Sequence, residues 1–289
     1  MTSTIFSRTA VPDGDTLGLT REHELVAQPR KGTIDWASFN RSQFDEASLE
    51  TARTLWSHRA FTEFHSLTHF SQLSSQLHLL GAPLDWSGAF ARMVSDEVRH
   101  TELCLRMVEA LGGSRDLTLP SLDGVHQTVP QGTLRAHVRR TVISAFCIGE
   151  TLSGRMFKRC LAGANVPLAR DVVTAILVDE TFHSELGWEL GALLMRPDEA
   201  VATEVAALEA ELPKLFADFA QQCLATKSAA WARAQPEFDD GPNFGTMSTA
   251  GYAHAFYEGM EHDVVPGLEA IGLGHARAAW EQFIATRRY

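Results

Sequence analysis

The chain has 289 residues, of which 45% are hydrophobic and 21% are charged, a balance that excludes a disordered protein. The formal net charge is −11, and an acidic surface repels phosphate backbones, so we expect no nucleic-acid partner. No uninterrupted apolar run approaches the roughly 20 residues of a transmembrane helix, and the first residues lack the apolar core of a secretory signal, so we expect no membrane span and a cytoplasmic location.

Hydrophobic periodicity predicts an all-α chain, because strand signals are weak throughout. Residues 1–44 are expected to form an irregular N-terminal arm. Long helices are expected at about 45–80, 85–112, 133–162 and 167–196, with a loop at 114–132. Residues 197–289 are expected to form a helical extension that begins with a cap at Asp198. In this extension Pro213 should kink or break a helix, and a loop at 235–247 should precede one or two short helices. We treat residues 1–289 as one domain.

Each of the four long helices has one stripe in which a glutamate interrupts apolar residues. The four residues are Glu63, Glu97, Glu150 and Glu180. A buried carboxylate is very costly unless it has a partner, a proton or a metal ion. These stripes therefore predict a polar centre inside a helical bundle.

Two octapeptides in the second and fourth helices match each other. Residues 96–103 read DEVRHTEL and residues 179–186 read DETFHSEL, with five of eight positions identical. Each contains Glu-x-x-His, which places a carboxylate and an imidazole on the same face of a helix. A single glutamate lies upstream of each motif, at a spacing of 34 residues in the first half (97 − 63) and 30 in the second (180 − 150). One such motif is expected by chance, but two inside a repeated octapeptide are not, and they predict a functional site.

The residue types predict a centre of two metal ions. Four carboxylates balance two divalent cations, and two neutral imidazoles, His100 and His183, add nitrogen ligands without charge. Carboxylate with imidazole suits iron or manganese, alone or mixed, better than thiolate-rich zinc sites. Asp96 and Asp179 precede the motif glutamates, and each is expected to accept a proton from a ligand histidine on a neighbouring helix; a solvated helix face is the alternative for both.

The paired Glu … Glu-x-x-His pattern resembles the ferritin-like di-iron carboxylate superfamily. The sequence Asp-Glu-x-Arg-His at residues 96–100 is similar to the form found in its oxygenase and oxidase branch. The resemblance covers about residues 50–195 and implies a four-helix bundle over 45–196. It implies that the metal ligands are Glu63, Glu97, His100, Glu150, Glu180 and His183.

The resemblance also implies an O2-dependent enzyme, a di-iron oxidase or oxygenase that oxidises a small organic substrate. An apolar or amphipathic substrate is expected, because Met93, Phe146 and Ile176 each precede a ligand glutamate by one helical turn and Gly149 leaves room; ordinary core packing is the alternative. An external electron donor is expected, and we allow for a homodimer. Two other readings stay open. One is a ferroxidase or rubrerythrin-like protein that handles iron or peroxide, and the other is a helical interaction protein with a structural metal.

Overall fold

The computed structural model describes residues 34–115, 132–196 and 201–287, and these residues form helices and turns without a β-strand. The predicted all-α class is therefore confirmed. The chain divides into two compact units, residues 1–138 and 139–289. None of the described helices combines the length and the apolar character needed to cross a membrane. Most of the predicted arm, most of the 114–132 loop and the predicted cap at Asp198 lie outside the described residues.

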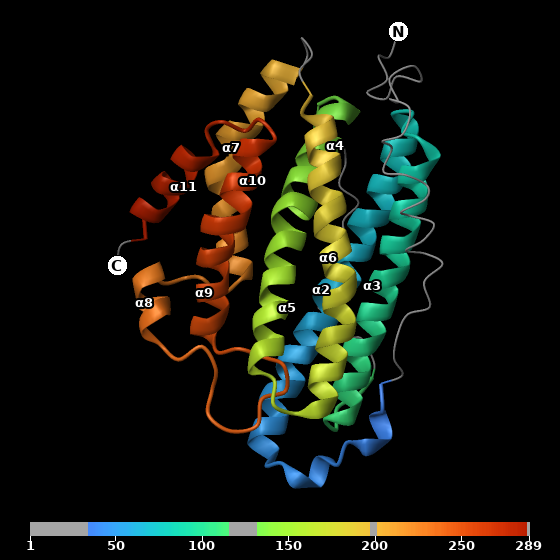
Figure 1. Ribbon diagram of the computed structural model, residues 1–289, viewed down its shortest axis with the longest axis vertical. Coiled ribbons are helices and arrows are strands. Elements are labelled where there is room, and N and C mark those ends of the chain that lie inside the picture. The colour runs from blue at the N-terminus through green and yellow to red at the C-terminus, as the bar shows by residue number, and fades with distance from the viewer. Residues whose placement is uncertain (1–33, 116–131, 197–200, 288–289) are drawn as a thin grey trace. The chain divides into compact units, whose positions relative to one another are not determined.

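The first unit is built on an antiparallel pair of long helices, α2 (Glu46–Leu79) and α3 (Leu84–Ala110), which lie side by side (Figure 1). Two short 3-10 turns, η1 (Trp36–Ser38) and η2 (Arg41–Gln43), precede them. The side chain of Asp45 caps α2 by accepting a hydrogen bond from the Ser48 backbone N–H at 2.8 Å. Gly81 adopts a positive φ of 80° in the turn between the helices, a conformation that glycine adopts without strain.

In the second unit, the helix predicted at 133–162 is present but is not a regular α-helix. It consists of α4 (Leu134–Thr141), the π-helix η4 (Val142–Glu150) and α5 (Thr151–Gly163), and the boundary between the units falls inside α4. Thr133 caps it, because its hydroxyl accepts a hydrogen bond from the Ala136 N–H. Helix α6 (Pro167–Leu194) packs on both η4 and α5. The π-helix was not expected, and it ends at one of the predicted ligands.

The rest of the second unit is a layer of shorter helices: α7 (Val201–Gln222), α8 (Ala229–Ala234), α9 (Thr249–Gly259), π-helix η5 (Met260–Val264), α10 (Val265–Ala270) and α11 (Ala276–Ala285). Helix α9 packs on α5 and α8, and α11 packs on α7 (Figure 1). Pro213 lies inside α7, so of the kink or break expected at this proline the break is wrong and the kink stays a prediction. More helical segments follow the 235–247 loop than the one or two that we expected.

Ion pairs join α5 to the 235–247 loop, α9 and η5. Arg159 pairs with Glu237 at 2.6 Å and also with Glu258, while Arg155 pairs with Asp263 at 2.6 Å. The arginine partners hold the pKa of Glu258 below its ordinary value although burial opposes them. These pairs hold α5, the helix that follows η4, between α6 and α9.

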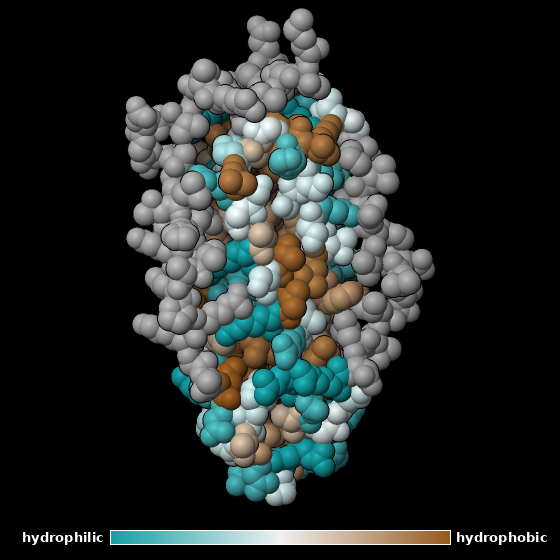
Figure 2. All heavy atoms as spheres, turned by 90° about the vertical axis from the view of Figure 1, so that its right-hand side faces the viewer, coloured by the Kyte–Doolittle hydropathy of each residue, from teal (hydrophilic) through white to brown (hydrophobic). Residues whose placement is uncertain are grey.

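Large apolar side chains of the described residues are mostly buried, but a few are exposed singly. Val98 on α3 is 54% exposed and Val178 on α6 is 65% exposed. The face in Figure 2 accordingly mixes hydrophilic and hydrophobic residues, with a small hydrophobic group near its middle. Scattered exposed apolar residues are normal on a globular protein, so they indicate no particular partner.

Candidate metal centre

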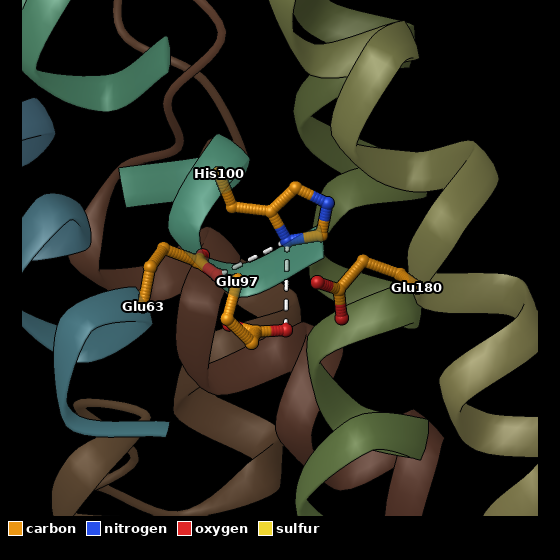
Figure 3. Close-up of side chains that lie close together, drawn as sticks. All are labelled: Glu63, Glu97, His100 and Glu180. Carbon is orange, nitrogen blue, oxygen red and sulfur yellow. Dashed lines mark ion pairs between the residues drawn. The ribbon is translucent and has the colours of Figure 1, made fainter. Parts of the chain in front are cut away.

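The first unit brings together three of the predicted ligands. Glu63 comes from α2, while Glu97 and His100 come from consecutive turns of α3, and their side chains point toward one another (Figure 3). His100 Nδ1 lies 3.5 Å from Glu63 Oε2 and 3.6 Å from Glu97 Oε1. All three residues are buried. One ligand atom from each lies within 4.8 Å of those of the other two, so this triad could hold a metal ion.

The second unit brings together the other three. Glu150 is the last residue of η4, and Glu180 and His183 lie on consecutive turns of α6. His183 Nδ1 lies 3.4 Å from Glu150 Oε2, and all three residues are buried. Their ligand atoms also lie within 4.8 Å of one another, so this triad could hold a metal ion as well. The repeated octapeptides thus give each unit a triad of the same composition.

These distances fit coordination better than hydrogen bonding. An N–H···O hydrogen bond is usually about 2.7–3.2 Å long, shorter than the 3.4–3.6 Å between each imidazole Nδ1 and its carboxylate oxygens. Two ligand atoms that each lie about 2.1 Å from one ion are separated by about 3.0 Å at a right angle and about 3.4 Å at a tetrahedral angle. The observed separations therefore leave space for an ion between the imidazole and the carboxylates of each triad.

The two aspartates beside the motif glutamates are buried. Asp96 has an exposed fraction of 0% and Asp179 of 4%, which excludes the alternative of a solvated helix face. Asp96 Oδ2 accepts a hydrogen bond from Arg92 Nε at 3.2 Å, one turn earlier on α3. Asp96 is thus paired with a side chain of its own helix beside Glu97.

The predicted apolar neighbours of the ligands are buried, with one exception. Met93 lies in the core of the first unit, and Phe146 and Ile176 lie in the core of the second. Gly149 is only partly buried, and a Cβ there would meet Phe219 of α7 at 3.6 Å. A side chain added at Gly149 would therefore pack against α7. The substrate pocket itself stays a prediction.

Sequence reasoning missed a set of side-chain hydrogen bonds beside the second triad. Thr151 directly follows Glu150, and Ser184 directly follows His183, and their hydroxyl oxygens lie 3.0 Å apart. The indole N–H of Trp188 donates to the same Thr151 hydroxyl at 2.9 Å. These bonds tie the start of α5 to α6 beside the ligands. Residue 64, which follows Glu63 in the first unit, is phenylalanine and cannot form this bond.

Burial near the first triad also affects a cysteine. Cys104 lies one turn beyond His100 on α3 and is completely buried. Burial, reinforced by the charge of Glu63, raises the pKa of its thiol well above the ordinary value. The thiol is therefore protonated at neutral pH. A neutral thiol is a poor metal ligand, so the carboxylates and the imidazole are the candidate ligands of the first triad.

Comparisons of the chain with protein-family models, with curated proteins and with solved structures found no match. The interpretation of the two triads therefore depends on their own geometry and chemistry.

Proposed function

We propose that the chain is a di-metal protein of the ferritin-like kind that its sequence resembles, and that each triad supplies ligands for one of the two metal ions. The proposal is supported by one observation above all: each unit holds a buried Glu, Glu, His triad in which the two His–Glu distances are nearly equal, at 3.5 and 3.4 Å. Repeated sequence and repeated geometry are both expected of a site with two equivalent metal positions.

The charge of the four buried carboxylates supports the binding of two divalent ions. Four buried carboxylates would repel one another strongly without cations, and two divalent ions would neutralise them. Carboxylate oxygen with imidazole nitrogen favours iron or manganese. We therefore propose two iron ions, with manganese or a mixed pair as the alternative loading.

The reaction that we propose is oxidation of a small organic molecule by O2. Bound ferrous iron would supply the electrons that reduce O2 and so allow a C–H or N–H group of the substrate to be oxidised. An external donor would return the electrons that the substrate does not provide.

The protein residues have separate roles in this proposal. The ligand glutamates and histidines lie on long helices, which hold their ligand atoms in fixed directions. Asp96 and Asp179 would each accept a hydrogen bond from the N–H of the second imidazole nitrogen and so fix the tautomer of a ligand histidine. Buried Met93, Phe146 and Ile176 would exclude water beside the centre and favour an apolar or amphipathic substrate.

The metal centre is tested by counting metal ions. Full-length protein reconstituted with Fe2+ without oxygen should bind two ions per chain. Glu97→Ala should lose at least one of them, because it removes a buried carboxylate of the first triad. Glu102→Ala is the matched control: Glu102 lies on the same helix but is exposed and pairs with Arg115 at 2.9 Å. A count of two ions in both variants would contradict the proposed centre.

The reaction is tested separately with the ferrous protein. We expect apolar or amphipathic organic compounds to accelerate O2 consumption and to be oxidised. If O2 is consumed only in proportion to added Fe2+ and ferric mineral accumulates, the protein is a ferroxidase. If the ferrous protein does not react with O2, the metal is structural and the oxygenase proposal is wrong.

A further inference from the structure

A second cluster of metal-binding side chains lies on α2, away from the glutamate triad. His65 and His69 are four residues apart, so they lie one above the other on the same face of the helix. Both are only partly buried. Their ring centroids lie 5.0 Å apart, with an angle of 69° between the ring planes.

This face differs from the face that presents Glu63. An α-helix turns by about 100° per residue, so His65 is rotated from Glu63 by about 200° and His69 by about 240°. Neither imidazole can therefore reach the ion that Glu63 would bind. The histidine pair has to be explained independently.

The separation of the rings matches two imidazoles on one ion. With a metal–nitrogen distance of about 2.1 Å, each ring centroid lies about 3.2 Å from the ion. Centroids 5.0 Å apart then subtend an angle of about 100° at the metal, between square-planar and tetrahedral geometry. The observed spacing is thus compatible with both rings binding one ion.

We propose that His65 and His69 form a bis-imidazole site for a single borderline divalent cation, with Cu2+, Ni2+ and Zn2+ as the class of ligand. Two nitrogen ligands without a carboxylate select these ions over Mn2+, Mg2+ and Ca2+, which prefer oxygen. The remaining coordination positions face the partly exposed surface of α2 and are filled by water.

The environment of His69 is suited to this role. Burial, together with the neighbouring His65, lowers the pKa of His69 below its ordinary value. The neutral form of imidazole is the metal ligand, so proton competition at neutral pH is weak.

Cu2+ binding to the full-length protein tests the site. Equilibrium dialysis and electron paramagnetic resonance should detect, beside any Cu2+ that the triads take up, one further Cu2+ with nitrogen ligands, and His65→Gln and His69→Gln should each lower the affinity of this ion at least tenfold. His58→Gln and His78→Gln are matched controls, since both histidines lie on α2 and are exposed. Circular dichroism verifies that every variant keeps its helical content.

The same measurement on Glu97→Ala separates the two proposals. This Cu2+ ion should bind the variant as tightly as it binds the unchanged protein, whatever happens to the iron. Unchanged Cu2+ affinity in both His65→Gln and His69→Gln, or an equal loss in His58→Gln, would overturn the bis-imidazole site. Loss of the ion only in Glu97→Ala would assign it to the glutamate triad and would also overturn the site.

Discussion

At the scale of single residues, burial determines which ionisable groups can react. Cys147 and Cys223 are buried in the second unit, and neither forms a disulfide. Burial raises the pKa of Cys223 to about 12 and raises that of Cys147 as well. The thiolate is the reactive form of cysteine, so both residues should be chemically inert while the protein is folded.

We therefore expect iodoacetamide at pH 8 to label Cys147 and Cys223 far more slowly in the native protein than in guanidinium. The same shift has a consequence for stability. The folded state keeps the thiol protons that the unfolded state loses above pH 9, so the free energy of unfolding should fall as the pH rises from about 9 to 12. Peptide mass spectrometry measures the labelling. Equal labelling rates in both states would show that these thiols are not protected.

At the scale of elements, close packing between helices was harder to predict than the helices themselves. The apolar stripe of α6 that contains Glu180 and ends at Leu194 is buried throughout, as a 3.6-residue period predicts. Over η4, by contrast, nearly every residue is apolar (VISAFCIGE), so no polar face marks the phase of the helix. A π-helical turn shifts that phase, and the structure buries Leu152 and leaves Ser153 partly exposed.

Two glycines where η4 and α6 pack, Gly149 and Gly187, should have opposite effects on stability when each is replaced by alanine. At Gly187 on α6, a Cβ would lie 2.7 Å from Phe146 Cβ and 3.1 Å from the Phe146 backbone, so α6 and η4 would have to separate. Gly187→Ala should therefore lower the free energy of unfolding by about 1–3 kcal/mol. At Gly149 the nearest atom is 3.5 Å away, an ordinary contact. Alanine also has the higher helix propensity, so Gly149→Ala should be neutral or stabilising by up to about 1 kcal/mol.

Urea denaturation of both variants measures these changes. Because the two substitutions add the same methyl group, the comparison isolates packing between α6 and η4 from helix propensity. A loss of stability in Gly149→Ala as large as that in Gly187→Ala would contradict the packing at η4.

The candidate site was predictable from sequence to the extent that it depends on local spacing. Glu97 with His100, and Glu180 with His183, share a helix face because they are three residues apart, and this follows from helix geometry alone. Glu63 and Glu150 were inferred from their place in apolar stripes, which is weaker evidence. The hydrogen bond between Thr151 and Ser184 depends on how α5 packs on α6, and no local pattern encodes it.

At the scale of the whole molecule, each triad joins two segments that are distant in the sequence. The first links α2 to α3, and the second links η4 to α6. An ion bound by either triad would hold its two helices together and would bind only the folded chain. Metal binding should therefore be coupled to folding in both units.

Removal of the metal should lower the thermal midpoint without abolishing the helical fold, because most of the core is apolar and independent of the triads. Free metal at 100 times its dissociation constant adds about 2.7 kcal/mol of stability per site. For a chain of this size, 1 kcal/mol changes the midpoint by about 2–4 °C, so each site should contribute about 5–10 °C. Calorimetry before and after chelation measures the change. In Glu97→Ala chelation should produce a smaller shift, whereas in Glu102→Ala it should produce the full one. A midpoint that chelation leaves unchanged in the intact protein would mean that the triads do not bind metal in the folded state.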